Sequence, residues 1–345
     1  MNLVSKISVA GLLICMSAMA AESPGTVHLT SATIPYSVLA SEAARQKFLA
    51  MIATPSGPPP GSSLAEQLRF YATFNHDLAQ QMLKRYDVTI KADRIANVAV
   101  DIITPAQGIA RRNQGRVLIN LHGGAFMWGA HDGGLIESIP IASIGQIKVI
   151  TVDYRESPDN VFPAASQDVA AVYATLSKRY PAKNIGIYGC SAGGILTAEA
   201  TAWILTHSLA KPGAVGTFCG SVLDILGDSA FLGAPLSGQP FSDDPLSAKA
   251  LPYFKGVDLK DPMAIPGQSP ALIAQFPPTL LITGSRDFAM SSVVRSHALL
   301  VEANVDSELH VYEGMWHAFL IYPELPESQA AYKVIVRFFD RHLGV

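Results

Sequence analysis

Charged residues and cysteines are scarce in this 345-residue chain. Only 15% of the residues are charged and only three are cysteine. Small secreted domains held by disulfides contain far more cysteine, so a disulfide framework is excluded as the basis of the fold. The 25 basic and 28 acidic residues give a formal net charge of -3. No basic field is available for a phosphate backbone, and we expect no nucleic-acid partner.

Long apolar runs are also missing, except for one near the N-terminus. Lys6 is the only charged residue among the first twenty, and an apolar run over 7–16 leads to small residues at Ala18 and Ala20. The run is too short to span a bilayer comfortably and is typical of a secretory signal peptide. We expect removal of residues 1–20, no stable membrane insertion afterwards, and a periplasmic or secreted mature protein. An uncleaved N-terminal anchor is the alternative.

Hydrophobic residues, in contrast, make up 49% of the chain, which is enough for a large core. Over residues 98–345, short apolar segments alternate with amphipathic ones. This pattern predicts an α/β fold with a mostly parallel central sheet and helices on both faces. Residues 21–97 predict two helices and a first strand. Residues 223–276, rich in Gly, Pro and Ser, interrupt the alternation, and we expect this insertion and the N-terminal helices to form a cap.

The most specific motif is Gly-Cys-Ser-Ala-Gly-Gly at 189–194, between an expected strand and an expected helix. G-x-S-x-G in this context forms a sharp turn that exposes the serine above the sheet edge. The flanking glycines avoid collisions with the neighbouring strand and helix. The motif predicts Ser191 as a nucleophile and the N–H of Ala192 as a donor to an oxyanion. We interpret Cys190 as a small buried residue and not as the nucleophile.

A serine hydroxyl needs a base, and the base needs a carboxylate to orient it. On a sheet of this kind both follow the serine in the chain, each just after a strand. Asp287 and His317 each come directly after an apolar segment that we expect to be a strand. Because the carboxyl ends of parallel strands meet at one edge, we expect Ser191, Asp287 and His317 to meet there. Glu313 is the rival acid, but it lies within the loop that carries the base.

A third motif, His-Gly-Gly-Ala-Phe at 122–126, follows another expected strand. Its glycines allow the backbone to turn and to direct N–H groups at a reacting carbonyl oxygen. Each such donor typically lowers the barrier by about 3–4 kcal/mol. A plain Gly-Gly turn is the alternative. We interpret His122 as a structural hydrogen-bonding residue that supports the loop together with Gly123, and not as a second base.

These motifs together resemble the hormone-sensitive-lipase family of α/β-hydrolase esterases, especially its bacterial members. Residues 122–126, 153–165 and 189–194 are similar to the family's HGGGF, DYRLAPE…FPAA and GDSAGG blocks. The resemblance implies an α/β-hydrolase fold with a cap. It implies hydrolysis of esters with short to medium acyl chains through an acyl-enzyme. It also implies that the N–H groups of Gly124, Ala125 and Ala192 form the oxyanion hole.

Four single positions depart from the family pattern, and Glu156-Ser157-Pro158-Asp159 keeps only part of the block after the tyrosine. Ala125 replaces the third glycine, Cys190 the usual acidic residue, Phe288 a proline after the acid, and Ala318 a glycine after the base. None of these changes removes a catalytic group. They concern the shape of the acyl pocket and the range of substrates.

The sequence therefore predicts a serine carboxylesterase that acts on a small-molecule ester. It contains no H-E-x-x-H motif and no phosphate loop, so we expect neither metal nor cofactor. A homodimer is left open. An amide, formamide or lactone hydrolase would use the same triad. A catalytically inactive ligand-binding module on the same fold is a further hypothesis.

Overall fold

The computed structural model describes residues 25–29, 33–54, 57–59, 61–242 and 244–344. The expected signal peptide, residues 1–20, lies outside the described residues. The chain divides into two units, residues 1–35 and residues 36–345. The described residues of the first unit contain no helix or strand. The sheet, its helices and the candidate site all belong to the second unit.

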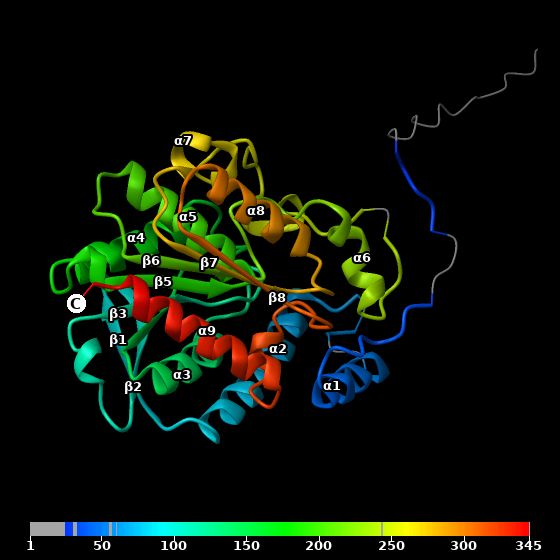
Figure 1. Ribbon diagram of the computed structural model, residues 1–345, viewed down its shortest axis with the longest axis horizontal. Coiled ribbons are helices and arrows are strands. Elements are labelled where there is room, and N and C mark those ends of the chain that lie inside the picture. Colours follow the sequence, from blue (N-terminus) through cyan, green and yellow to red (C-terminus); the bar gives the residue numbers. More distant parts are fainter. Residues whose placement is uncertain (1–24, 30–32, 55–56, 60, 243, 345) are drawn as a thin grey trace, which may run out of the picture. The chain divides into compact units, whose positions relative to one another are not determined.

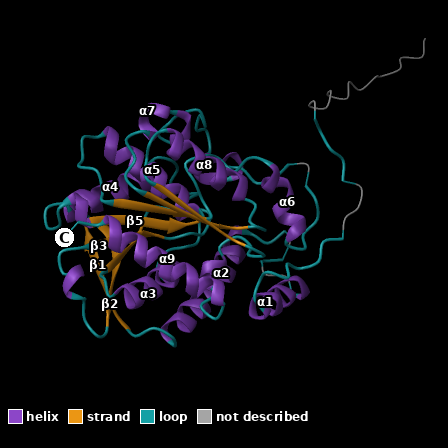
Figure 2. Ribbon diagram, viewed as in Figure 1, coloured by secondary structure: helices purple, strands orange, loops and turns teal. Residues whose placement is uncertain are grey.

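The described residues of the second unit form an eight-stranded sheet (Figures 1 and 2). Its strands lie in the order β1-β2-β4-β3-β5-β6-β7-β8. Strand β2 is antiparallel to β1 and to β4, and the other pairings are parallel, which confirms the predicted mostly parallel sheet. The strands are β1 (Val88–Ile95), β2 (Val98–Pro105), β3 (Val117–Leu121), β4 (Val149–Asp153), β5 (Ile185–Cys190), β6 (Ala214–Phe218), β7 (Thr279–Gly284) and β8 (Ser307–Tyr312).

Successive side chains of the central strands are buried on opposite faces of the sheet. In β3, Leu118 belongs to one apolar cluster, whereas Val117 and Ile119 belong to another. Side chains alternate along a strand, so a strand that is covered on both faces has a continuous apolar sequence. This explains why the strands could be located from short apolar segments.

Helices cover both faces (Figure 1). Helices α3 (Asp132–Gly145) and α9 (Pro326–His342) cover one face, and α4 (Ala164–Leu176), α5 (Ala192–Thr206) and α8 (Met290–Glu302) cover the other. In α9 the buried side chains Ile335, Phe338 and Phe339 recur at helical spacing. Connections through helices are what parallel neighbouring strands require.

Two N-terminal helices and a long connection complete the unit. Helix α1 (Glu42–Ala53) begins at Ser41, whose N–H and hydroxyl donate to Glu327 at the start of α9. Helix α2 (Leu64–Leu83) begins with a capping box of Ser63 and Glu66. The connection from β6 to β7 contains α6 (Asp228–Leu236) and α7 (Pro270–Ile273), in the region where the sequence predicts an insertion. Among the described helices, none has the length and apolar content needed to cross a membrane.

Candidate active site

The turn between β5 and α5 carries Ser191. Its backbone has φ 57° and ψ -122°, a conformation rarely adopted by a residue with a Cβ atom. A Cβ atom on Gly189 or Gly193 would lie 2.2 or 1.8 Å from the carbonyl oxygen of Leu121 on β3. Only glycine therefore fits at these two positions. The turn can approach β3 closely while its strained apex presents the serine side chain.

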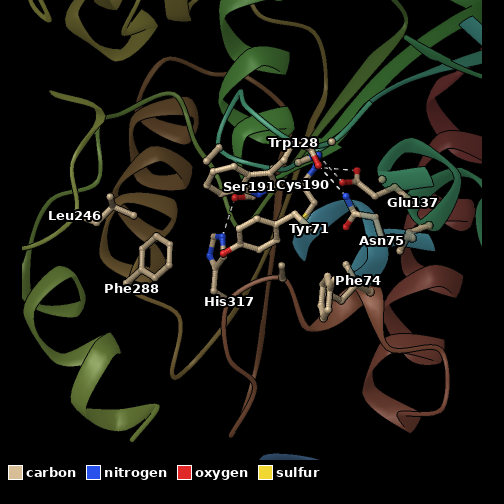
Figure 3. A pocket seen from close by; sticks show the side chains of 18 residues that line it. Tyr71, Phe74, Asn75, Trp128, Glu137, Cys190, Ser191, Leu246, Phe288 and His317 are labelled. Atoms are coloured by element: carbon tan, nitrogen blue, oxygen red, sulfur yellow. Dashed lines mark hydrogen bonds between the residues drawn. The ribbon is translucent and has the colours of Figure 1, made fainter. Parts of the chain in front are cut away.

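Ser191, His317 and Asp287 form a chain of hydrogen bonds. The Oγ atom of Ser191 lies 2.8 Å from Nε2 of His317 (Figure 3). Nδ1 of the same ring lies 2.8 Å from Oδ1 of Asp287. Asp287 follows β7 and His317 follows β8, so two adjacent parallel strands bring the pair together. With Nδ1 donating to Asp287, Nε2 is free to accept the proton of the serine hydroxyl.

The carboxylate of Asp287 is completely buried and held at both oxygens. The N–H of Ala289 donates to Oδ1 at 2.9 Å, and the hydroxyl of Thr283 donates to Oδ2 at 2.9 Å. Burial raises the pKa of this carboxyl, but the charge of His317 and the hydrogen bonds together outweigh burial and hold the pKa below its ordinary value of 3.8. Asp287 therefore stays ionised and can stabilise an imidazolium.

The geometry separates this triad from its rivals. Glu313 is exposed, whereas the partner of His317 is the buried Asp287. Cys190 and Cys219 are both buried and both free, so they form no disulfide.

The loop after β3 lines the same cavity as Ser191. Gly124 and Ala125 have φ angles of 104° and 53°, so the backbone turns sharply at both residues. Within the described residues neither N–H donates to a protein acceptor, and both residues line the cavity of Ser191. Ala192, the third predicted donor, begins α5, where the first N–H groups of a helix have no acceptor within the helix.

The block at 153–157 supports this loop. The hydroxyl of Tyr154 donates to the carbonyl of His122 at 2.6 Å, and the two rings stack with centroids 4.1 Å apart. The N–H of Ser157 donates to the carbonyl of Phe126 at 2.7 Å. Nδ1 of His122 lies 2.8 Å from the carbonyl oxygen of Gly123. The block that the family resemblance singled out therefore holds the predicted oxyanion loop through the carbonyl groups of His122 and Phe126.

Glu137 on α3 was missed in the sequence. Its carboxylate accepts hydrogen bonds from the N–H of Gly123 and the N–H of Cys190 (Figure 3). It also accepts one from the side-chain amide of Asn120. A signal was present, because Glu137 is the only charged residue in the apolar segment 135–144. Such a residue on a buried helix needs hydrogen-bonding partners.

A cavity of about 410 Å³ lies over the triad and has mostly apolar walls (Figure 3). Helix α2 contributes Tyr71 and Phe74, and the connection from β6 to β7 contributes Leu246. The rings of Tyr71 and Trp128 stack with centroids 4.2 Å apart. The four residues that depart from the family pattern all line the cavity: Ala125, Cys190, Phe288 and Ala318.

Two groups of described residues bring potential metal ligands together: Cys219, Asp287 and His317, and Asp101, His131 and Asp153. In the first group Asp287 and His317 are engaged in the hydrogen bonds of the triad. In the second, Nδ1 of His131 lies 3.1 and 3.5 Å from Oδ2 of Asp153 and of Asp101. This second group lies where β2 meets β4.

A family model described as an alpha/beta hydrolase fold matches residues 118–321. The chain belongs to this α/β-hydrolase family. The matched segment contains Ser191, Asp287 and His317, so it includes all three residues of the hydrogen-bonded chain. The fold class predicted from the sequence is thereby confirmed.

Relatives of this α/β-hydrolase include an acetyl-hydrolase from Streptomyces hygroscopicus, 26% identical over 236 residues that cover 68% of this chain and 78% of the relative. An esterase from Acinetobacter venetianus is 26% identical over 257 residues, which cover 73% of this chain and 82% of the relative. The crystal structure of esterase E25 matches with a TM-score of 0.79 and 29% identity, over 92% of this chain and 99% of its own. An esterase of the bacterial hormone-sensitive lipase family shares the fold, with a TM-score of 0.75 and 23% identity over 88% of this chain and 100% of its own.

Proposed function

We propose that the protein is an exported serine carboxylesterase that hydrolyses esters with short to medium acyl chains through an acyl-enzyme. One observation carries the proposal: Ser191, His317 and Asp287 are joined by two hydrogen bonds of 2.8 Å beneath an apolar cavity. The names of the relatives, acetyl-hydrolase and esterase, support ester hydrolysis.

The reaction begins when Oγ of Ser191 attacks the ester carbonyl while Nε2 of His317 takes the hydroxyl proton. Asp287 holds the imidazole in the required tautomer and stabilises its positive charge. The N–H groups of Gly124, Ala125 and Ala192 bind the oxyanion. His317 then gives the proton to the departing alcohol, which leaves the acyl group on the serine. Water repeats the two steps and releases the acid.

The cavity sets the expected size of the substrate. A volume of about 410 Å³ lies at the lower end of the range for small-molecule sites. Its aromatic and aliphatic walls suit an acyl chain better than a charged group. We expect the rate to be highest with short esters and to fall with long ones.

Hydrolysis of p-nitrophenyl esters from acetate to laurate tests the proposal, with the wild-type protein and Ser191→Ala compared. Turnover that peaks at short chains and disappears in the variant is expected. Ser177→Ala is the matched control, and it should retain turnover because Ser177 ends α4 and does not line the cavity. Equal background rates in all three proteins would rule out these esters. Amide and lactone substrates, and then ligand-binding assays, would follow.

Export is tested separately from activity. Expression of the full chain in a bacterial host, followed by cell fractionation and N-terminal sequencing, should yield a periplasmic or secreted protein that begins near residue 21. A cytoplasmic protein that retains residues 1–20 would contradict export and leave the catalytic proposal intact.

A further inference from the structure

We propose that Glu137 is a positioning residue that locks the oxyanion loop to the serine turn, supplying from α3 the carboxylate that the family pattern places directly before the serine. The inference rests on the proposed function, because it concerns the same reaction. Cys190 occupies the position where the resemblance leads one to expect an acid.

The hydrogen bonds of Glu137 connect the two halves of the catalytic machinery. Oε1 accepts from the N–H of Gly123 at 2.8 Å, one residue before the first predicted oxyanion donor. Oε2 accepts from the N–H of Cys190 at 3.1 Å, one residue before the nucleophile. One rigid carboxylate therefore sets the distance between the oxyanion donors and Ser191.

The two backbone segments leave little room for adjustment. A Cβ atom on Gly123 would lie 3.0 Å from the carbonyl oxygen of Cys190 and 3.4 Å from Cβ of Ser191. The loop and the turn are thus already in close contact, and the carboxylate fixes their register. Misplacing oxyanion donors raises the barrier without weakening substrate binding, because the donors act on the developing charge.

A carboxylate suits this position better than an amide. Glu137 faces three N–H donors, and an ionised carboxylate offers acceptors at both oxygens, whereas an amide offers one oxygen. The third donor is fixed in turn: the amide of Asn120 donates to Oε2 at 3.0 Å, and its oxygen accepts from the hydroxyl of Thr151 at 2.8 Å. A glutamine at 137 would place an NH₂ group against a donor.

The charge state of Glu137 gives the experiment a second readout. Burial raises its pKa to about 7, although hydrogen bonds from Asn120, Gly123 and Cys190 lower it. The ionisable groups that face it are Tyr154, Tyr188 and the Cys190 thiol, and the pKa of each is raised above its ordinary value. All three are neutral near pH 7, so Glu137 is the group among them that changes charge there.

The test compares wild type, Glu137→Gln, Glu137→Ala and the control Asp132→Asn. Asp132 is a carboxylate on the same helix that pairs with His76 and is separate from the site. Each protein is assayed with p-nitrophenyl acetate and with its thionoester, whose C=S sulfur accepts hydrogen bonds weakly. The rate ratio of the two esters reports the oxyanion hole, because effects that are common to both esters cancel from it.

We expect kcat for the oxoester to fall roughly 10- to 100-fold in Glu137→Gln and further in Glu137→Ala, with KM nearly unchanged. The oxoester-to-thionoester ratio should fall with it. In wild type and Asp132→Asn the ratio should decline between pH 8 and pH 6, whereas in Glu137→Gln it should be independent of pH. Losses of rate that are equal for both esters and follow the folded fraction would show a purely structural role and overturn the proposal. Full activity of Glu137→Gln would also overturn it.

The outcome is separable from the proposed function. If wild type hydrolyses neither ester, the rate at which a p-nitrophenyl phosphonate modifies Ser191 still measures the register of loop and turn. Slower modification in Glu137→Gln than in Asp132→Asn would support the positioning role, and equal rates would overturn it. A wild-type serine that does not react with the phosphonate would overturn both proposals.

Discussion

The ring of Phe288 lies against the imidazole of His317, with the ring centroids 4.1 Å apart and 23° between the ring planes. Phe288 directly follows Asp287, so one short segment after β7 holds His317 by a hydrogen bond and by a ring contact. The same ring forms part of the cavity wall. The family pattern has a proline here, which could not stack in this way.

Phe288→Ala should therefore loosen the base and enlarge the cavity at the same time. Aromatic contacts of this kind contribute about 0.5–1.5 kcal/mol, so kcat for acetate should fall roughly two- to tenfold. Because the cavity becomes larger, the optimum acyl length should move to longer chains. The p-nitrophenyl ester series measures both effects. An unchanged chain-length profile would mean that Phe288 does not bound the acyl site.

Asp287→Asn should abolish most of the activity while the fold is retained. An asparagine can place an NH₂ group against Nδ1 of His317 and favour the wrong tautomer, an effect on the order of 10⁴-fold in kcat for such triads. Asparagine also meets the hydroxyl of Thr283 and the N–H of Ala289, both of which donate to the carboxylate. Steady-state kinetics with circular dichroism as the folding control measures this. A loss below tenfold would argue for a different acid.

The same carboxylate should contribute to stability in a pH-dependent way. The pKa of Asp287 lies below the ordinary value of 3.8, so its contribution is present above that pH and is lost as the pH falls through the lower folded-state pKa. Thermal unfolding of wild type and Asp287→Asn between pH 7 and pH 3 tests this. The difference in Tm should be constant above about pH 5 and should shift against wild type toward pH 3. A constant difference over the whole range would contradict the lowered pKa.

Gly193→Ala should prevent formation of the active turn. The new Cβ atom would lie 1.8 Å from the carbonyl oxygen of Leu121, and backbone on both sides cannot move away without displacing β3 or α5. We expect aggregated protein or loss of all activity. Gly115→Ala is the control, because the nearest atom to its Cβ would be the side-chain nitrogen of Asn184 at 3.6 Å, an ordinary contact. Soluble yield and turnover of the two variants give the comparison.

Arg286 should couple Tyr36 and helix α1 to the loop that carries Asp287. Its guanidinium lies 4.8 and 4.9 Å from the ring centroids of Tyr36 and Phe48, and Nη1 donates to the carbonyl of Leu236 at 2.7 Å. Arg286→Ala should lower the free energy of unfolding by about 1–3 kcal/mol. It should also reduce kcat, because Asp287 is the next residue.

The control for this prediction is Arg295→Ala on α8. Arg295 forms an exposed ion pair with Glu302, which is worth at most about 1 kcal/mol. Thermal unfolding and kinetics of both variants measure the difference. Equal Tm values for the two variants would show that the contacts of Arg286 with Tyr36 and Phe48 contribute little to stability.

Much of the candidate site could be predicted because its reactive residues lie in short sequence motifs. Ser191, Asp287 and His317 each follow an apolar strand segment, and neighbouring parallel strands end at the same edge of the sheet. The glycines that flank Ser191 belong to the same short motif. Close contact with β3 forbids a Cβ atom at these positions. The sequence by itself therefore determined the fold class and the chain order of Ser191, Asp287 and His317, and it predicted the oxyanion loop.

Only the tertiary structure decided the rest. Glu137 accepts from Gly123 and Cys190, which lie 14 and 53 positions away in the chain, and no periodicity indicates such a contact. The cavity wall combines Tyr71, Leu246 and Phe288 from three separate segments. Strand and turn formation depend on neighbouring residues, whereas the register of the loop and the shape of the pocket depend on side chains that meet only after the chain has folded.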